Sequence, residues 1–275
     1  MQWISNAREM RELDRSAIGE RGIPSTRLME AAARAVADYL ALELTRMFLF
    51  LVSFALVLLL WLLLSRVLDL ACGTGTMSFL LAERGYEVIG VDFSPEMLAV
   101  AAEKSLEGEG EAPIFLCQSM EELDLYGTIR GAVSTFDTFN HIPDLDTAIA
   151  NAGFFMEKGG VFLFDMNTPY KHQNVLGDNE FTFEEEDAAC VWRNHYDAAN
   201  RRVEITVDID YHETGEHFHE QFCEYTYDLD TIRTALEKHG FALESVCDGE
   251  TFGPLTEDSQ RYFFCAVKQY TQLEG

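Results

Sequence analysis

The sequence predicts an α/β protein built on a doubly wound, mostly parallel, seven-stranded sheet. Three observations support this prediction. From residue 66 to residue 165, short apolar segments rich in β-branched residues alternate with helical segments. A stretch with period-two alternation, residues 180–227, then predicts an inserted antiparallel β-meander with one solvated face. A helix and two further apolar strands close the chain.

The charge and the cysteines limit the class of protein. The 275 residues include 20 basic and 47 acidic side chains, which give a net charge of −27. Such a field repels phosphate backbones, and no basic run exceeds the pair 201–202, so we expect no nucleic-acid partner. The six cysteines are widely spaced and form no Cys-x-x-Cys pair, which predicts reduced thiols in a cytoplasmic protein.

Residues 1–46 predict a helical leader. Asn6 and Glu9 have the spacing of a capping box, and a turn at 22–25 separates two helices. The segments 4–14 (ISNAREMRELD), 22–24 (GIP) and 28–30 (LME) resemble the amino terminus of the NAD(P)HX epimerase family. The resemblance ends near residue 40, and the glycine-rich dinucleotide loop of that family is absent, so no epimerase activity is implied.

Residues 47–65 form a strongly apolar segment. Ser53 is the one polar side chain between Met47 and Leu64, and Arg46 and Arg66 flank the run. A helix of this length would span about 27 Å, close to the thickness of the hydrocarbon core of a bilayer. The segment is therefore a candidate membrane span, and the alternatives are a buried helix or an artefact of a fused chain.

Residues 66–275 predict the α/β domain, with the antiparallel insertion at about 178–227. Helices are expected over 77–84 with Thr76 as the cap, over 95–106 with Ser94 as the cap, over 144–156 and over 230–239. A short helical turn is expected at 120–123. The seven strands of the main sheet are expected over 66–70, 87–91, 113–117, 131–136, 159–165, 241–246 and 262–268.

The segment 67–76 (VLDLACGTGT) reads as a buried strand, a glycine turn and a helix start. Gly73 and Gly75 let the backbone turn tightly and leave no side chain between it and a ligand. Open α/β sheets bind their ligands at such carboxyl ends of strands. The alternative is an ordinary strand-to-helix turn, and Asp92 at the end of the next strand argues against it.

Residues 66–270 resemble the class I S-adenosylmethionine-dependent methyltransferases. The segments 67–75 and 90–98 (GVDFSPEML) are similar to the first two motifs of that family, glycines 159 and 160 precede the fifth strand, and the closing helix-strand-strand is typical of it. The resemblance implies a Rossmann-like fold, S-adenosylmethionine as the cofactor and S-adenosylhomocysteine as its product. It also implies direct methyl transfer without a metal.

The resemblance further implies which residues bind the cofactor. Asp69 would lie near its amino group, the turn residues would contact its methionine part, and Asp92 would accept hydrogen bonds from both ribose hydroxyls. Phe93 and Met97 would flank the adenine. The full set of expected cofactor residues is Asp69, Ala71, Cys72, Gly73, Gly75, Asp92, Phe93, Met97, Gln118, Ser119, Met120 and Phe136.

Catalytic residues are expected after the fourth and fifth strands. Methyl transfer requires in-line positioning, and a base is needed only if the acceptor loses a proton. His141 is the preferred base because imidazoles exchange protons near neutral pH, with Asp137 and Tyr170 as further catalytic residues. The alternative for His141 is a loop histidine bonded to the backbone.

The inserted meander is expected to cover the pocket of a small-molecule acceptor. Its aromatic residues would shape that pocket, among them Trp192, Tyr196, Tyr211 and Phe218. His212, His217 and His219, with Glu216 and Glu220, resemble a metal site in composition. Since spacing fixes no third ligand, a solvated strand face is the preferred interpretation.

Two other functions remain open from the sequence. A nicotinamide-dependent oxidoreductase uses a similar sheet, but its fingerprint requires a glycine where Ser78 stands. A non-catalytic, membrane-tethered protein with a cofactor-type fold is the second alternative, since the leader and the apolar run replace the helical lid of similar bacterial enzymes. The oligomeric state and the acceptor are not indicated.

Overall fold

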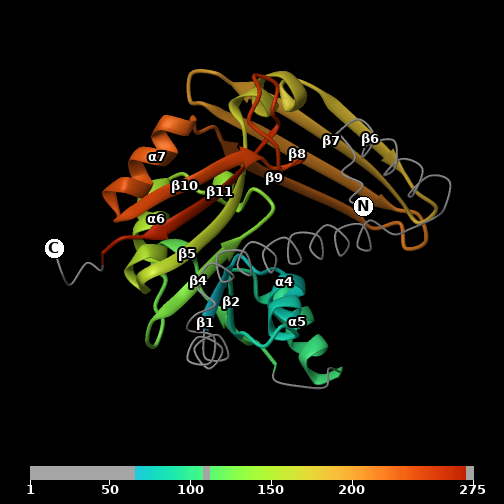
Figure 1. The fold of residues 1–275 in the computed structure, drawn as a ribbon. Coiled ribbons are helices and arrows are strands. Elements are labelled where there is room, and N and C mark those ends of the chain that lie inside the picture. The colour runs from blue at the N-terminus through green and yellow to red at the C-terminus, as the bar shows by residue number, and fades with distance from the viewer. Residues whose placement is uncertain (1–65, 108–111, 271–275) are drawn as a thin grey trace, which may run out of the picture.

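The computed structural model describes residues 66–107 and 112–270, which form two β-sheets and the helices packed on them (Figure 1). The leader at 1–46 and the apolar run at 47–65 lie outside the described residues. One sheet has seven strands in the order β10-β11-β5-β4-β1-β2-β3, and the other has four in the order β6-β7-β8-β9. The predicted α/β fold with an inserted antiparallel sheet is confirmed.

The seven-stranded sheet is mostly parallel. Its strands are β1 (Arg66–Leu70), β2 (Glu87–Asp92), β3 (Ile114–Cys117), β4 (Ile129–Ser134), β5 (Met156–Asn167), β10 (Phe241–Asp248) and β11 (Arg261–Lys268). Strand β11 runs antiparallel to both of its neighbours, β5 and β10. The chain passes from β1 outward to β2 and β3 and then returns to β4 on the other side of β1. This reversal makes the carboxyl ends of β1 and β4 the expected ligand site.

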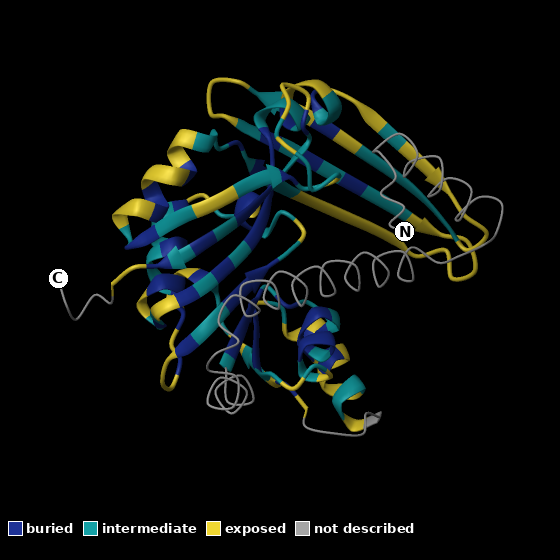
Figure 2. Ribbon diagram, in the orientation of Figure 1, coloured by how far each residue is buried: buried dark blue, intermediate teal, exposed yellow. Residues whose placement is uncertain are grey.

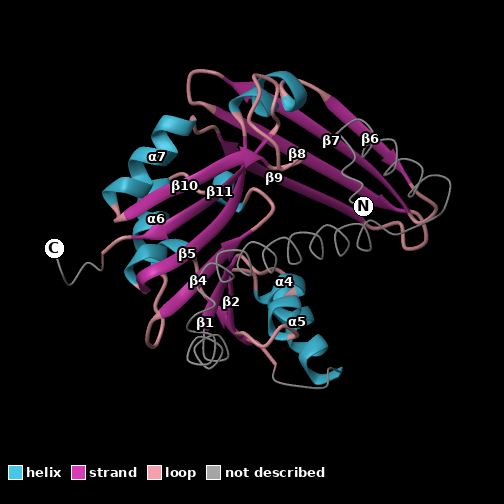
Figure 3. Cartoon of the chain, viewed as in Figure 1, coloured by secondary structure: helices cyan, strands magenta, loops and turns pink. Residues whose placement is uncertain are grey.

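Helices cover both faces of this sheet (Figure 3). They are α4 (Thr76–Ala82), α5 (Pro95–Glu107), α6 (Leu145–Phe154) and α7 (Leu229–Lys238), with a short 3-10 helix η3 (Met120–Glu122). One core cluster joins the strands to α6 and α7, and a second joins them to α4. Both faces of β1 are therefore buried, which explains why its residues after Arg66 are apolar except for Asp69 (Figure 2).

Capping side chains begin three of these helices. The Ser94 hydroxyl accepts from the Met97 amide, as predicted, and Asp144 and Asp228 cap α6 and α7. The predicted Thr76 cap is wrong. Thr76 is the first helical residue, and Gly75 is the cap in a left-handed conformation with φ of 76°. A glycine reaches this conformation without strain, so the helix starts without a capping side chain.

Two strands differ in length from the prediction. Strand β4 ends at Ser134, because the backbone turns at Phe136 and Asp137, which both have positive φ. Strand β5 begins at Met156, so Gly159 and Gly160 lie within it and not in a turn before it. The pairing of β4 with β5 shifts register between Ile129 and Gly131, which identifies a bulge at these glycines.

The inserted sheet consists of β6 (Glu180–Glu184), β7 (Ala188–Asp197), β8 (Arg202–Tyr211) and β9 (His217–Tyr225), all antiparallel. Alternate residues of β8, Val203, Ile205 and Val207, are buried in a small core of their own. The opposite face carries charged and polar side chains. The sheet is thus amphipathic, as the period-two pattern predicted.

The side chain of Asn140 joins the two ends of the insertion to the main sheet. Asn140 lies in the 3-10 helix η4 (Thr138–His141) that follows β4. Its amide nitrogen donates to the carbonyl of Tyr225 at the end of β9, at 2.9 Å. Its amide oxygen accepts from the backbone N–H of Asn167 at the end of β5, at 2.8 Å. Asn140 is fully buried, so this contact fixes where the insertion leaves and rejoins the core.

Candidate active site

A cavity of about 790 Å³ opens at the carboxyl edge of the main sheet, between this edge and strand β9. A volume of this size is typical of sites for small organic ligands. One wall comes from the ends of β1, β2 and β3, and the other comes from β9 together with the segment after β4, which contains η4. The lining residues are Ala71, Val91, Asp92, Phe93, Gln118, Ser119, Met120, Glu121, Phe136, Thr138, His141, Ile142, Pro143, Glu220, Phe222, Cys223 and Tyr225.

The turn after β1 and the start of the segment after β4 hold unusual backbone conformations. Ala71, Phe136 and Asp137 have φ of 56°, 64° and 49°. Non-glycine residues in this region cost on the order of 1 kcal/mol each, and such residues cluster at ligand sites. Ala71 and Phe136 both line the cavity. The strained residues therefore lie where the ends of β1 and β4 face the cavity.

The two glycines of the turn differ in their surroundings. A Cβ added at Gly73 would meet no atom within 4 Å, so this part of the backbone is open to a ligand. A Cβ added at Gly75 would lie 2.7 Å from the ring of Phe115 on β3. The missing side chain of Gly75 therefore leaves room for a core phenylalanine, whereas that of Gly73 leaves open space.

Asp92 is held in place by backbone amides. One carboxylate oxygen accepts from the N–H of Gly73 at 2.8 Å, and the other accepts from the N–H of Ser94 at 2.9 Å. The side chain lines the cavity although the residue is only 7% exposed. Each oxygen keeps a lone pair free, so the carboxylate can accept two more hydrogen bonds from one ligand.

Asp69 lies beneath the turn and not in the cavity. It is buried and accepts a hydrogen bond of 2.6 Å from the Ser78 hydroxyl. Burial raises the pKa of Asp69 to about 7, against the lowering effect of the Ser78 hydrogen bond. Ser78, which stands where a nicotinamide enzyme has a glycine, thus acts as the partner of this carboxyl group.

The loop after β3 forms the far end of the cavity. The Gln118 side chain bonds the backbone of Asp124 in both directions, with its amide nitrogen donating at 3.1 Å and its oxygen accepting at 3.0 Å. This places Ser119 and Met120 on the cavity wall. Phe93 is 76% exposed and faces the same space, as does Phe136. Exposed phenylalanines that line a cavity offer flat apolar surface to a ring.

Of the expected cofactor residues, Ala71, Asp92, Phe93, Gln118, Ser119, Met120 and Phe136 line the cavity, and Asp69, Cys72, Gly73, Gly75 and Met97 do not. Cys72 is buried below the turn, where its backbone N–H donates to the carbonyl of Val91. Met97 is on the exposed side of α5 and is 48% exposed. The first and second strand ends are thus brought together as predicted, and Gly73 reaches the site through its contact with Asp92.

The three expected catalytic residues lie in different surroundings. His141 lines the cavity, and its ring packs on that of Phe222 with the centroids 5.5 Å apart. Its Nε2 lies 3.9 Å from a carboxylate oxygen of Asp137, beyond hydrogen-bond range. Tyr170 does not line the cavity, because the chain enters the π-helix η5 (Lys171–Leu176) there and Tyr170 is its cap.

Asp137 belongs to a buried ion cluster. The guanidinium of Arg261 on β11 donates to Asp137 at 2.8 Å and also to Asp165 on β5. Burial raises the pKa of Asp137, but Arg261 and Lys171 outweigh it and hold the pKa below its usual value. For Asp165 burial prevails and the pKa is raised. A carboxylate held this way is a poor proton acceptor, so Asp137 is better suited to act on His141 through its negative charge.

A second buried network, which the sequence analysis missed, lies behind β9. Glu224 accepts from the side-chain amide of Asn167 at 2.8 Å and lies 3.0 Å from Nε2 of His172. Nδ1 of His172 lies 2.7 Å from the hydroxyl of Thr226. All four side chains are buried. The sequence contained one signal for this network, which is the presence of polar residues within the alternating pattern of the strands. Such residues indicate a buried network only when their partners are known.

The aromatic residues that shape this wall also differ from the prediction. Phe222 and Tyr225 of β9 line the cavity, whereas Trp192, Tyr196, Tyr211 and Phe218 do not. Trp192 supports Phe222 from behind, edge to face, with the ring centroids 5.7 Å apart. Tyr211 and Phe218 are exposed near the far end of the insertion. Which aromatic residues reach the cavity depends on how the inserted sheet is placed over the main sheet. The alternation of residues along a strand does not predict that placement.

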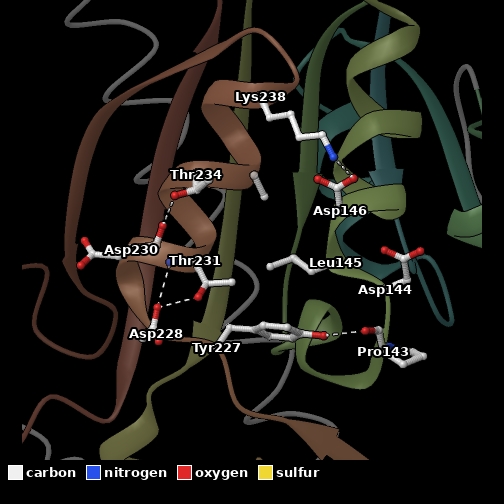
Figure 4. Close-up of a pocket in the computed structure, with 11 residues that line it drawn as sticks. Pro143, Asp144, Leu145, Asp146, Tyr227, Asp228, Asp230, Thr231, Thr234 and Lys238 are labelled. Carbon is white, nitrogen blue, oxygen red and sulfur yellow. Dashed lines mark hydrogen bonds and ion pairs between the residues drawn. The ribbon is translucent and has the colours of Figure 1, made fainter.

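A second cavity, of about 630 Å³, lies between α6 and α7 (Figure 4). Its polar groups are already engaged: Lys238 pairs with Asp146 at 2.6 Å, Asp228 caps α7, and the Tyr227 hydroxyl donates to the carbonyl of Pro143 at 3.1 Å. None of the residues that line it belongs to the glycine turn or to the ends of β1, β2 and β3. The cavity at the carboxyl edge of the sheet is therefore the candidate active site.

The strand order, the glycine turn and the strand-end acid together define the fold of a class I methyltransferase. Residues 67–160 match the profile of the family described as "Methyltransferase domain". YqeM of Bacillus subtilis (strain 168), classed as a methyltransferase, is 30% identical over 214 residues, which cover 75% of this chain and 85% of YqeM. The chain belongs to the class I S-adenosylmethionine-dependent methyltransferases, as the resemblance implied.

Solved structures share the fold. An S-adenosylmethionine-dependent methyltransferase from Clostridium acetobutylicum ATCC 824 superimposes with a TM-score of 0.75 at 20% identity and covers 96% of this chain and 100% of its own. CalS10 of Micromonospora echinaspora, an amino pentose methyltransferase with bound S-adenosylmethionine, gives 0.58 at 19% identity, over 75% of this chain and 84% of its own.

S-adenosylmethionine is the cofactor of this enzyme, and the open backbone at Gly73 and the preoriented Asp92 carboxylate fit it. Within residues 66–107 and 112–270, no helix combines the length and apolarity needed to cross a bilayer.

Proposed function

We propose that the enzyme transfers a methyl group from S-adenosylmethionine to a small organic acceptor that binds under strand β9. The observation that carries this proposal is the single cavity that contains both Asp92 and His141. Bound S-adenosylmethionine supplies an activated methyl group on a sulfonium. The protein then has to hold the donor and the acceptor in line and keep water out.

We propose that the wall formed by β1, β2 and β3 holds the cofactor. Asp92 accepts from both ribose hydroxyls, and its two backbone hydrogen bonds keep it oriented before the ligand arrives. Phe93, Phe136 and Met120 provide apolar surface for the adenine. The Gly73 backbone approaches the methionine part of the cofactor. Asp69, which is buried beneath the turn, lies near the amino group of that part. Gly75, Cys72 and Met97 support the turn and α5 from outside the cavity.

We propose that the wall formed by β9 and η4 holds the acceptor. His141 is the group that accepts a proton from it, and the negative charge of Asp137, which Arg261 fixes in place, stabilises the positive charge that His141 then carries. Phe222 and Tyr225 provide the apolar contact surface. Tyr170 has no role in this proposal, because it lies outside the cavity.

The charge of the cavity supports a neutral or cationic acceptor. Asp92, Glu121 and Glu220 line it, and none of the described lining residues is a lysine or an arginine. A phosphate or carboxylate on the acceptor would meet these carboxylates without a cationic partner. An amino or hydroxyl group is compatible, and CalS10, with the same fold, methylates an amino pentose.

The test is a screen of the full-length protein against amine, alcohol, phenol and carboxylate acceptors, with release of S-adenosylhomocysteine as the readout. We expect turnover of neutral or cationic acceptors and at least about tenfold less with anionic analogues. His141→Asn should lower kcat by about 100-fold or more, the range of general-base catalysis. The control His195→Ala removes an exposed histidine paired with Asp178 and should leave kcat unchanged. Turnover restricted to anionic acceptors would contradict the proposal.

We also propose the division of the chain into a leader (1–46), an apolar segment (47–65) and the methyltransferase domain (66–275). The six free cysteines support a reducing compartment such as the cytoplasm. Fractionation of cells that express the full chain tests whether 47–64 anchors it. Recovery in the soluble fraction without detergent excludes a spanning helix.

A further inference from the structure

The outer face of the inserted sheet brings two histidines opposite two aspartates. His217 and His219 lie on the same face of β9, two residues apart. In the antiparallel register, Asp208 of β8 pairs with His219 and Asp210 pairs with His217. The four side chains therefore stand side by side on the face opposite to Val207 and Ile209.

Three of these side chains converge on one point. Oδ1 of Asp208 lies 2.6 Å from Nδ1 of His219 and 3.5 Å from Nε2 of His217. One ligand atom from each residue lies within 4.8 Å of the others. Ligand atoms around a tetrahedral zinc ion, at bond lengths of about 2.0–2.2 Å, are about 3.3 Å apart. Shifts of less than about 1 Å would bring these atoms to that spacing.

Asp210 and Arg193 orient the three converging side chains. Asp210 lies 2.8 Å from Nδ1 of His217, which leaves Nε2 as the free ring nitrogen. Arg193 donates to the second oxygen of Asp208 at 2.5 Å. A carboxylate on the far nitrogen of a ligating histidine and a fixed ligating carboxylate are the usual supports of a metal site.

We propose that Asp208, His217 and His219 bind a divalent transition-metal ion of the Zn²⁺ type, with Asp210 and Arg193 as orienting residues and water completing the coordination. Two imidazoles select such ions over Mg²⁺ or Ca²⁺, which prefer oxygen ligands. The ion takes the place of the hydrogen bond between Asp208 and His219, and each histidine binds it as a neutral imidazole that keeps the proton on its other ring nitrogen. No bond of the acceptor or the cofactor is involved.

A second group of three ligand-type side chains in the described residues, Asp137, His141 and Glu224, does not support a metal site. Arg261 already pairs with Asp137, and Lys171 adds a further positive charge near Asp137 and Glu224. A divalent cation there would face two fixed cations. On the outer face, Arg193 contacts the oxygen of Asp208 that points away from the histidines. The comparison favours the outer face.

Metal binding would join β8 to β9 across the sheet. Strand β9 lies at the edge of its sheet, and the opposite face of the same strand carries Phe222 and Glu220 of the cavity. An ion bound by the folded chain alone stabilises it by an amount that grows with the logarithm of the ion concentration above the dissociation constant, and so raises Tm. We therefore expect a Tm increase of about 5 °C at 100 times the dissociation constant.

The test is a titration of the full-length, metal-free protein with Co²⁺ and with Zn²⁺, followed by visible absorption, calorimetry and Tm. We expect one ion per chain with nitrogen and oxygen ligands and no thiolate charge-transfer band, which separates this site from the six cysteines. His219→Ala should weaken binding by about 100-fold, and Asp210→Asn by about tenfold. The matched control His195→Ala removes an exposed histidine on neighbouring β7 and should change nothing.

His217, His219 and Asp210 are all exposed, so their substitution should leave the Tm of the metal-free protein unchanged. This keeps loss of binding distinct from loss of folding. Stoichiometric binding that survives both His217→Ala and His219→Ala, a thiolate band, or no binding of either ion would overturn the proposal.

Discussion

The two walls of the cavity are built in different ways. The wall formed by β1 and β2 is held by local contacts: Asp92 bonds Ser94 two residues away and Gly73 nineteen residues away, and Asp69 bonds Ser78 nine residues away. The wall formed by η4 and β9 is held by contacts between side chains that are distant in the sequence. Asp137 and Arg261 are 124 residues apart, and Asn167 and Glu224 are 57 apart.

The difference separates two tasks. A cofactor that is the same in every reaction can be bound by backbone amides and one carboxylate, which a short motif encodes. An acceptor pocket is assembled from elements that meet only in the folded chain, and buried ion and amide networks hold them in register. We expect substitutions of the groups that face the cavity on the first wall to affect mainly cofactor affinity, and substitutions in the buried networks of the second wall to affect mainly the free energy of unfolding.

The largest effect is expected at Arg261. Arg261→Ala leaves Asp137 and Asp165 buried together without their cation, and breaking such a buried pair costs about 3–5 kcal/mol of the free energy of unfolding. Urea denaturation measures it. The control Arg233→Ala removes an exposed ion pair with Asp230 and should cost less than about 0.5 kcal/mol. Equal costs for the two variants would remove the contrast between the walls.

The second effect concerns pH and Asp69. Its folded pKa of about 7 lies above the unfolded value of 3.8, so the native state keeps a proton that the unfolded chain loses. This stabilisation is complete below pH 3.8 and falls as pH rises to about 7, by about 4 kcal/mol in total at 1.36 kcal/mol per pKa unit. Asp69→Asn should remove this slope. A difference in unfolding free energy between wild type and Asp69→Asn that is the same at pH 5 and pH 8 contradicts it.

The third effect is cofactor affinity at Asp92. Asp92→Ala would remove the two charge-assisted hydrogen bonds that we propose Asp92 accepts from the ribose, which together would contribute about 3 kcal/mol, or about 100-fold in Kd. Asp92→Asn keeps one acceptor oxygen and should show a smaller loss. Calorimetric titration with S-adenosylmethionine measures both, and Glu103→Ala, an exposed carboxylate on α5, is the control. An unchanged Kd in Asp92→Ala would show that this wall does not hold the ribose.

The smallest effect separates the two glycines of the turn. Both have positive φ, so alanine costs about 1 kcal/mol of stability at either position. Gly75→Ala also places a Cβ 2.7 Å from Phe115 and should cost a further 1–3 kcal/mol or so of overpacking. Gly73→Ala meets no protein atom and should instead weaken cofactor binding. Thermal unfolding should therefore show the larger loss for Gly75→Ala, and titration with S-adenosylmethionine should show the larger loss for Gly73→Ala.

The sequence predicted most of the main sheet because its signals are local. Apolar strands, glycine turns and caps such as Ser94 act within a few residues, and all seven strands were placed in order. The prediction of a Thr76 cap was wrong because Gly75, in a left-handed conformation, is itself the cap, and the helix begins without a capping side chain. The end of β4 was misplaced because Phe136 and Asp137 adopt a conformation that their residue types do not indicate.

The candidate site was predicted unevenly for the same reason. Asp92 and the loop after β3 follow from strand order, whereas Phe222 and Tyr225 depend on how β9 sits over the main sheet. Asp208, the carboxylate beside His217 and His219, was missed because its contact comes from β-sheet register and not from spacing along β9. Sequence alternation assigns residues to a face but does not say which faces meet.

The contact of Asn140 with both ends of the insertion has a consequence for how such enzymes diversify. Because Asn167 and Tyr225 are bound by one amide, the chain leaves and re-enters the core at the same point. The four-stranded sheet between them is topologically a self-contained cassette, so its length and sequence can change without rerouting the host sheet. A lineage could thus exchange acceptors by replacing one segment, while the machinery that recognises the methyl donor is inherited intact.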